Sequence, residues 1–314
     1  MTDENRTPLL LQEIREPGAA QRGVRLLLGR DDLTHPELPG NKWRKLKHNL
    51  HAARTQGHDT LLTFGGAFSN HVAAVAAAGR LAGFRTIGLI RGEETRPLNP
   101  TLTQARADGM QLQYLSREAY RRKQELDFLA EILARTGPAY VLPEGGTNAL
   151  ALPGGAELIA ELTAQTDFDA VAVACGTGGT LAGLLTGLAG TREALGVAAL
   201  KNGSFLRDDV GALTLAATGR RYANWSLHTD YHFGGYAKFS AELLAFIHGF
   251  QTRHGVLLDP VYTGKLLFGV LDLIEKGYFR RGSTVVAIHT GGLQGWAGFR
   301  QRFESRSAWW PELA

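Results

Sequence analysis

The sequence has one cysteine, Cys175, among its 314 residues. A single cysteine cannot form a disulfide within the chain, and this usage is typical of a reducing compartment. Long apolar runs are also missing, because no stretch reaches the roughly 18 apolar residues of a membrane-spanning helix. The first residues are partly acidic and do not resemble a signal peptide. We therefore expect a soluble, cytoplasmic protein without membrane contact.

Strong charge of one sign is lacking as well. Lys and Arg number 34 against 30 Asp and Glu, which leaves a formal net charge of +4. The longest basic cluster, Arg121-Arg122-Lys123, is too short for a nucleic-acid surface, so we expect no nucleic-acid partner. The length and the 44% hydrophobic content allow a large core, and chains beyond about 250–300 residues tend to form two domains.

Glycine, in contrast, is abundant at 39 residues, and it repeatedly follows apolar runs. Strand-like runs that lead into glycine turns occupy 59–66, 169–180 and 282–292. Helical patterns follow or separate them, including an alanine-rich one that ends at Gly83. Strands that alternate with helices predict an α/β fold with largely parallel sheets.

The segment Cys175–Thr180, with the sequence CGTGGT, lies between a predicted strand and a predicted helix. Its glycines let backbone N–H groups approach an anion at the positive end of the helix, although a tight turn without a ligand has the same appearance. No Gly-Lys-Ser/Thr follows, which argues against a P-loop. Leu181 occupies the last glycine position of a dinucleotide fingerprint, which argues against a nicotinamide enzyme. We interpret the segment as a phosphate-binding loop.

A second strand-to-helix turn contains Ser69, Asn70 and His71. Ser69 is a good N-cap, and the helix start could also bind a substrate carboxylate. No G-x-S-x-G motif is present, so a serine hydrolase is disfavoured. A third predicted strand ends at Thr290, at the edge of the sheet where α/β proteins bind ligands.

The stretch LPGNKWRKLKHNL, residues 38–50, is either a solvated basic helix face or the site of a lysine that does covalent chemistry. Lys42 lies in the first helical turn, whose partial positive charge lowers the pKa of an ammonium and so frees the amine as a nucleophile. Asn41 could orient what Lys42 binds, and we expect Lys45 and Lys47 to extend into solvent. Apolar residues at helical spacing predict the core face: Trp43, Leu46, Leu50 and Ala53.

Taken together, these motifs resemble the 1-aminocyclopropane-1-carboxylate deaminase / D-cysteine desulfhydrase family of pyridoxal-phosphate enzymes. The resemblance covers roughly residues 30–300 and rests on four motifs in the same order: Gly40-Asn41-Lys42-x-Arg44-Lys45, Gly65-Gly66-x-x-Ser69-Asn70, the loop around Thr177-Gly178-Gly179-Thr180, and Asp259–Lys265 with the sequence DPVYTGK. It implies the tryptophan-synthase β-like fold, known as fold type II, with two open, twisted, mostly parallel sheets and flanking helices.

The resemblance also implies roles for individual residues. Lys42 matches the lysine that forms the Schiff base with pyridoxal 5'-phosphate, and Asn70 matches the residue that hydrogen-bonds the cofactor's phenolic oxygen. Ser69, with Asn70 and His71, would bind the substrate. Tyr262 would stack at the cofactor ring, and Tyr236 would be a second active-site tyrosine. The remaining cofactor-binding positions are Gly176, Thr177, Gly178, Gly179, Thr180 and Thr290, and no metal is expected.

Two differences between this chain and the deaminase subgroup bear on the reaction. The deaminase subgroup has Glu where this chain has Thr263, and Leu where it has Thr290, whereas desulfhydrase-like members have threonine at both positions. Opening a cyclopropane ring requires a strong electron sink, which an acid near the cofactor's pyridine nitrogen supports. We therefore expect a lyase that converts D-cysteine to pyruvate, hydrogen sulfide and ammonia. The alternatives are 1-aminocyclopropane-1-carboxylate deamination to 2-oxobutanoate and a catalytically silent binding protein.

The resemblance implies a discontinuous domain layout. Residues 1–45 and 155–314 would form a large cofactor domain, and residues 46–154 a small domain that closes over the substrate. A homodimer is usual for the family.

Overall fold

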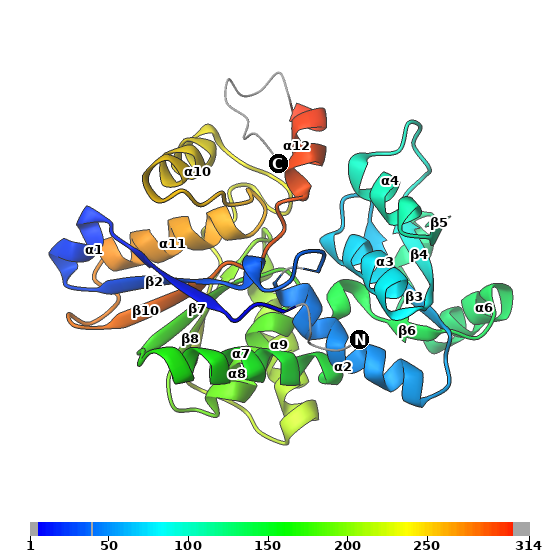
Figure 1. Cartoon of the computed structure of the whole chain (residues 1–314), viewed down its shortest axis with the longest axis horizontal. Helices are drawn as coiled ribbons and strands as arrows, with labels where there is room; N and C mark the ends of the chain where they lie inside the picture. The colour runs from blue at the N-terminus through cyan, green and yellow to red at the C-terminus, as the bar shows by residue number, and fades with distance from the viewer. Residues whose placement is uncertain (1–5, 39, 304–314) are drawn as a thin grey trace.

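The strands form two separate sheets in the computed structural model, which describes residues 6–38 and 40–303 (Figure 1). In the larger sheet β1 runs antiparallel to β2 and the other pairings are parallel. Its strands, in spatial order, are β1 (Leu10–Ile14), β2 (Arg25–Arg30), β10 (Thr284–Ile288), β7 (Ala170–Cys175), β8 (Glu193–Ala198) and β9 (Trp225–His228).

Helices cover both faces of this six-stranded sheet (Figure 1). Every residue of β7 is buried, with Ala170, Ala172 and Ala174 in the core on one face and the alternate residues in the core on the other. The helices on the first face are α1 (Pro17–Arg22), α10 (Ala241–His254) and α11 (Thr263–Glu275); those on the second are α7 (Leu152–Gln165), α8 (Gly179–Leu188) and α9 (Leu206–Thr218). This two-sided burial explains why β7 is a continuous apolar run.

The four-stranded sheet is parallel throughout. Its spatial order is β5 (Met110–Leu115), β4 (Arg85–Arg91), β3 (Thr60–Gly66) and β6 (Tyr140–Leu142). One face packs against α2 (Asn41–Thr55), α3 (Asn70–Ala82) and α4 (Pro100–Ala107), and the other against α5 (Arg117–Arg121) and α6 (Leu126–Thr136). Shorter elements and the last described helix are η2 (Asp31–Leu33), η3 (Glu144–Gly146), η4 (Ala149–Ala151), η5 (Gly203–Phe205) and α12 (Gly295–Phe303).

The structure confirms the predicted α/β class and the strands now seen as β3, β7 and β10. It also confirms that the alanine-rich helix, α3, ends at Gly83, which has a left-handed φ of 72° and donates its N–H to the Gly79 carbonyl. Glycine adopts this conformation without steric cost, which is why the helix ends there.

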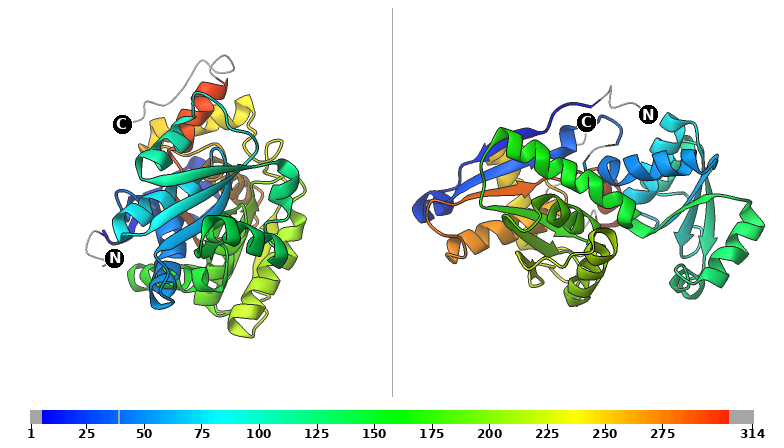
Figure 2. Two further views of the ribbon diagram at one scale, coloured as in Figure 1. Left: turned by 90° about the vertical axis from the view of Figure 1, so that its right-hand side faces the viewer. Right: turned by 90° about the horizontal axis from the view of Figure 1, so that it is seen from below.

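The two sheets lie in separate parts of the molecule (Figures 1 and 2). The predicted domain boundaries, at 45/46 and 154/155, fall within α2 and α7, and this division stays a prediction. Across the described part of the chain, no helix has the length and apolar character that crossing a bilayer requires.

Candidate active site

Lys42 is tied to the glycine loop through a single neighbouring side chain. Its Nζ donates to Asn41 Oδ1 at 3.0 Å, and Asn41 Nδ2 donates to Thr180 Oγ1 at 2.9 Å. Asn41 and Lys42 begin α2, and Thr180 lies in the first turn of α8. Residues 139 positions apart in the sequence thus hold the amine beside the predicted phosphate-binding loop.

The turn before Lys42 requires a glycine. Gly40 has a φ of 68°, and a Cβ at this position would lie 2.2 Å from the Thr290 carbonyl oxygen. Any side chain at Gly40 would therefore push α2 away from the segment that follows β10. This close approach brings the first turn of α2 to Thr290, which is buried at the carboxyl end of β10.

The pKa of Lys42 is lowered to about 8, chiefly because burial disfavours the charged ammonium, while the Asp259 carboxylate acts in the opposite direction. The sequence predicted a lowered pKa from the charge at the helix start, whereas the structure shows that loss of water is the main cause. At neutral pH a useful fraction of the amine is uncharged, as a nucleophile or a base requires.

The glycine loop 176–179 packs closely against its surroundings. A Cβ at Gly176 would lie 3.1 Å from Tyr262 Cε1, and a Cβ at Gly179 would lie 3.0 Å from Lys45 Nζ. Gly178 is the N-cap of α8 and has a left-handed φ of 75°. The loop therefore presents backbone, rather than side chains, to the space beside Tyr262 and Lys45 at the start of a helix.

The prediction that Lys45 extends into solvent is wrong. Lys45 is 5% exposed, and its Nζ donates to the Gly145 carbonyl and to Thr147 Oγ1, both at 3.2 Å. Burial, together with the nearby Lys42 charge, holds its pKa well below the ordinary value. The spacing of three residues from Lys42 places both lysines on one face of α2, a signal that the sequence carried.

Residues 69–71 form the start of α3, and their side chains point to different surroundings. Ser69 Oγ accepts from the Val72 N–H at 3.3 Å, which confirms the predicted cap. Asn70 reaches the C-terminal segment, because a Cβ at Gly292 would lie 2.8 Å from Asn70 Nδ2. His71 is buried, with its Nε2 2.8 Å from Thr63 Oγ1, and burial beside two lysines holds its pKa well below the ordinary range.

The two predicted tyrosines are in contact. The ring centroids of Tyr236 and Tyr262 are 6.1 Å apart in an edge-to-face arrangement. Tyr236 is 44% exposed, whereas burial and the neighbouring Tyr236 raise the pKa of Tyr262 well above 10. The Tyr262 hydroxyl therefore keeps its proton at physiological pH.

Asp259 orients Tyr262, a role that the sequence reasoning missed. Its carboxylate accepts hydrogen bonds at 2.7–2.9 Å from the Val261, Tyr262 and Thr263 N–H groups and from the Thr263 hydroxyl. The Thr263 hydroxyl is thus engaged in the turn before α11. The signal was the Asp-Pro pair that opens DPVYTGK, since aspartate side chains commonly close turns onto the backbone that follows.

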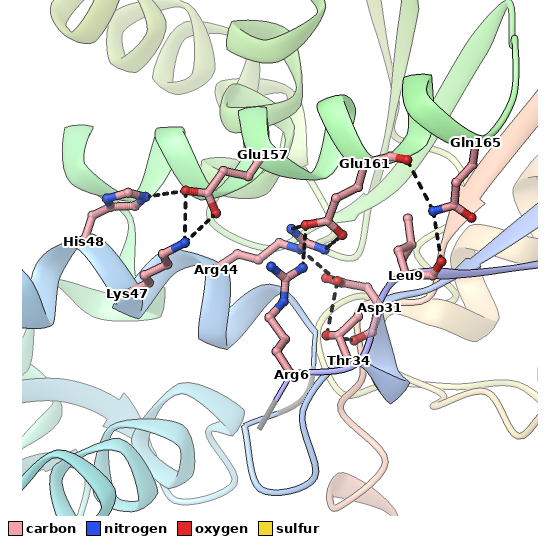
Figure 3. Close-up of polar contacts among 10 residues, drawn as sticks. All are labelled: Arg6, Leu9, Asp31, Thr34, Arg44, Lys47, His48, Glu157, Glu161 and Gln165. Atoms are coloured by element: carbon pink, nitrogen blue, oxygen red, sulfur yellow. Dashed lines mark hydrogen bonds and ion pairs between the residues drawn. The ribbon is translucent and has the colours of Figure 1, made fainter. Parts of the chain in front are cut away.

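A buried ionic network fixes the lysine-bearing helix to its neighbours (Figure 3). Arg44 is 3% exposed, and its Nε donates to Asp31 Oδ1 at 2.8 Å. Its two terminal nitrogens donate to Glu161 of α7 at 3.0 and 2.9 Å, and Arg6 pairs with the same carboxylate. Two residues beyond Lys42, α2 is therefore held on both α7 and η2.

Lys42, Lys45 and the loop 176–180 together fit a phosphate ester that also carries an aldehyde. Both amines donate to neutral oxygens and not to carboxylates, so a bound anion would stabilise their charged forms, and α8 adds the partial positive charge of its N-terminus. In the described ranges, no group of three or more His, Cys, Asp or Glu residues could hold a metal ion.

Comparison with known proteins agrees with this chemistry. Residues 1–291 match the family described as pyridoxal-phosphate dependent enzyme. A putative 1-aminocyclopropane-1-carboxylate deaminase from Pyrococcus horikoshii is 33% identical over 282 residues, covering 87% of this chain and 86% of that protein. A D-cysteine desulfhydrase from Yersinia enterocolitica is 33% identical over 288 residues, covering 86% and 87%. The crystal structure of an ACC deaminase homologue superimposes with a TM-score of 0.85 at 30% identity, covering 96% of this chain and 94% of that one.

The fold and the site define a pyridoxal-phosphate-dependent enzyme of fold type II. Within that class, the chain belongs to the family that contains the 1-aminocyclopropane-1-carboxylate deaminases and D-cysteine desulfhydrases.

Proposed function

We propose that this enzyme is a lyase that converts D-cysteine and water to pyruvate, hydrogen sulfide and ammonia. The observation that carries the proposal is the partly buried Lys42 amine, with a pKa of about 8, held next to the glycine loop by Asn41 and Thr180. An amine in this state and position can bond an aldehyde and then act as a base.

The cofactor's groups have matching partners in the site. Lys45 and the loop Gly176, Thr177, Gly178, Gly179 and Thr180 would hold the phosphate. Lys42 would bond the aldehyde, Asn70 the phenolic oxygen, and Tyr262 and Thr290 would flank the ring. When bound, pyridoxal phosphate supplies an aldehyde that condenses with amines and a ring that withdraws electrons from the substrate's α-carbon.

The side chains around the ring would bind the substrate and move its protons. The start of α3 would hold the carboxylate with Ser69 and Asn70, since helix N-termini favour anions. His71 stays uncharged and is bonded to β3, so we assign its imidazole to shaping this helix start. The α-proton would go to the Lys42 amine or to the neighbouring hydroxyl of Ser69 or Tyr236, whereas Tyr262, which keeps its proton, would act as a donor.

The bond changes balance without an oxidant or reductant. The Cα–H bond gives its proton to the base, and its electron pair forms a second bond between Cα and Cβ. The Cβ–S bond breaks at the same time with its electron pair on sulfur, which leaves as hydrosulfide. The double bond then takes a proton at Cβ, and water replaces nitrogen at the α-carbon and releases ammonia, which gives pyruvate. Tyr262, whose raised pKa keeps its hydroxyl protonated, can donate a proton to the departing sulfur.

A second candidate is deamination of 1-aminocyclopropane-1-carboxylate to 2-oxobutanoate and ammonia, because several similar proteins and one similar structure carry that name. Thr263 and Thr290 argue against it. Neither is a carboxylate, and the Thr263 hydroxyl is already engaged with Asp259. A site without an acid at these positions favours a substrate whose leaving group accepts electrons readily.

The test is a product screen on the cofactor-loaded enzyme with D-cysteine, L-cysteine and 1-aminocyclopropane-1-carboxylate. We expect pyruvate and sulfide from D-cysteine. Lys42→Ala should lower turnover roughly 10²–10⁴-fold or more and remove the visible band of the lysine-bound cofactor. Lys47→Ala, on the same helix in a partly exposed ion pair with Glu157, should change neither.

Three results would contradict the proposal. Release of 2-oxobutanoate from the cyclopropane alone would assign the deaminase reaction. Bound cofactor without turnover of any substrate would indicate a silent binding protein. Full activity in Lys42→Ala would remove the lysine from the mechanism.

We propose a cytoplasmic homodimer in which residues 46–154 close over the substrate. The dimer rests on the family resemblance, and light scattering should give twice the 34.0 kDa chain mass. The location rests on Cys175, a lone buried thiol that fits a reducing compartment.

A further inference from the structure

Lys265 places an amine inside the helical layer of the six-stranded sheet, and no role in the site described above uses it. It lies on α11 and is 0% exposed. Its Nζ donates to the Gly235 carbonyl at 2.8 Å and to the Ala199 carbonyl at 3.2 Å. These acceptors belong to the loop that carries Tyr236 and to the residue that follows β8.

A lysine at this buried position lowers the stability of the folded protein. Burial lowers the pKa of Lys265 to about 8, with the Asp259 carboxylate in opposition, so the fold disfavours its charge. Its neighbours Leu266 and Leu267 are core residues, and an apolar side chain of similar length would fill the same space without desolvating an amine. What distinguishes lysine here is the pair of hydrogen bonds at the end of its side chain.

The loop that receives one of these bonds has an unusual backbone. Phe233 and Ala237 are non-glycine residues with φ values of 49° and 53°, and Gly234 and Gly235 between them have φ values of 92° and 117°. Side chains disfavour this left-handed region, so such a segment persists only where its surroundings hold it. A fixed donor at the Gly235 carbonyl acts at the centre of this segment.

The residue directly after Gly235 is Tyr236, which contacts Tyr262. Tyr262 immediately precedes α11, and Lys265 lies three residues beyond it on the same helix. The N-terminal end of α11 and its capping residue therefore contact the tyrosine loop twice, once through the Tyr262 ring and once through the Lys265 amine. A shift of the Gly235 carbonyl would move the Tyr236 ring away from the site.

We propose that Lys265 is a positioning residue that holds Tyr236 at the active site by fixing the Gly235 carbonyl to α11. It does not touch substrate or cofactor and acts only through the tyrosine loop. The effect on turnover rests on the proposed lyase function, whereas the effect on the loop does not.

The first arm of the test is hydrogen–deuterium exchange of the full-length enzyme. We expect Lys265→Met to speed amide exchange in residues 233–238 at least about tenfold, because the Gly235 and Lys238 N–H groups donate to carbonyls within this loop. Lys47→Met, the same chemical change on α2, should leave this segment unchanged. Unaltered exchange in Lys265→Met would overturn the proposal, even if the enzyme had no lyase activity.

The second arm is a double-mutant cycle on D-cysteine turnover. Lys265→Met should lower kcat roughly 10- to 100-fold, as expected when an active-site group is misplaced. In a Tyr236→Phe background the same change should have less than about a twofold effect, because the group that it positions is gone. Losses that multiply in the double variant would show that Lys265 acts by another route.

Lys265→Gln provides a second variant should the methionine protein not fold. It keeps two N–H donors on a shorter side chain that cannot span both carbonyls. Faster exchange in 233–238, with retained cofactor binding, supports the proposal. Wild-type exchange in this variant contradicts it. If the wild-type enzyme has no lyase turnover but the Lys265 variants still exchange faster than wild type in 233–238, the lyase function is refuted and the positioning role of Lys265 stands.

Discussion

Lys42 keeps an amine inside the fold at the expense of stability. Its pKa of about 8 lies below the ordinary lysine value of 10.5, so the folded protein disfavours the charge that the unfolded chain accepts freely. Active sites often retain such unfavourable groups because their chemistry requires them. The cost belongs to this one residue and can be measured without cofactor or substrate.

We predict that Lys42→Met stabilises the cofactor-free protein by about 1 kcal/mol at pH 7. Between pH 8 and 10 the unfolded wild-type chain binds more protons at this residue than the folded one, so wild-type stability rises with pH there. The advantage of the variant should therefore be largest below pH 8 and shrink toward pH 10. Urea unfolding of both proteins at several pH values measures it, and a less stable variant, or a pH-independent difference, would contradict it.

For single residues, the sequence pattern identified Lys42 as the reactive lysine but wrongly predicted that Lys45 is exposed to solvent. Both lie on one face of α2, yet only the tertiary structure places Gly145 and Thr147 over Lys45. A pattern along one helix indicates which side chains share a face, whereas it does not reveal whether the other half of the chain covers that face. Asp259 was missed for a related reason, because its carboxylate influences the Lys42 charge only once the fold brings the segment before α11 near the start of α2.

At the scale of elements, α2 depends on the buried network of Arg44, Asp31 and Glu161 (Figure 3). Asp31 is 0% exposed, and burial raises its pKa although the Arg44 guanidinium acts in the opposite direction. Removing Arg44 would leave Asp31 as an uncompensated carboxylate in the interior. Such a loss costs more than a broken surface ion pair, where water replaces the missing partner.

We predict that Arg44→Met lowers the free energy of unfolding by about 3–5 kcal/mol at pH 7. Lys47→Met, three residues further along α2 in a partly exposed pair with Glu157, should cost only about 0–1 kcal/mol. Guanidinium unfolding of the two variants beside wild type measures both effects. Equal losses would mean that the buried network does not anchor the helix.

The strands and most helices could be predicted, because the spacing of apolar residues and the glycines that end each element are properties of short sequence segments. The buried network could not be predicted, because Arg44 and Glu161 are 117 positions apart and neither local sequence indicates that they pair. The same applies to Lys265, whose bond to Gly235 joins two segments 30 residues apart.

For the whole molecule, the site combines elements from both sheets. Lys42 and the glycine loop lie beside the six-stranded sheet, while Ser69 and Asn70 follow β3 of the four-stranded one. The contacts between these parts include the hydrogen bond of 2.5 Å between Thr147 and Thr177. A movement of one sheet relative to the other would change the distance between the substrate-binding and cofactor-binding groups, which is the physical basis for the proposed closure of residues 46–154.

We predict that a non-sulfur analogue, D-serine, shortens the distance between α4 and α10, which lie in different parts of the molecule (Figure 1). Ala107→Cys and Ala245→Cys place spin labels on exposed positions of these helices. The native Cys175 should not compete for the label, because it is buried and burial raises its thiol pKa to about 12. Pulsed electron paramagnetic resonance should show a decrease of more than about 2 Å on ligand addition, the scale of a hinge movement. A distance distribution that D-serine leaves unchanged would mean that the site is already assembled and that residues 46–154 do not close.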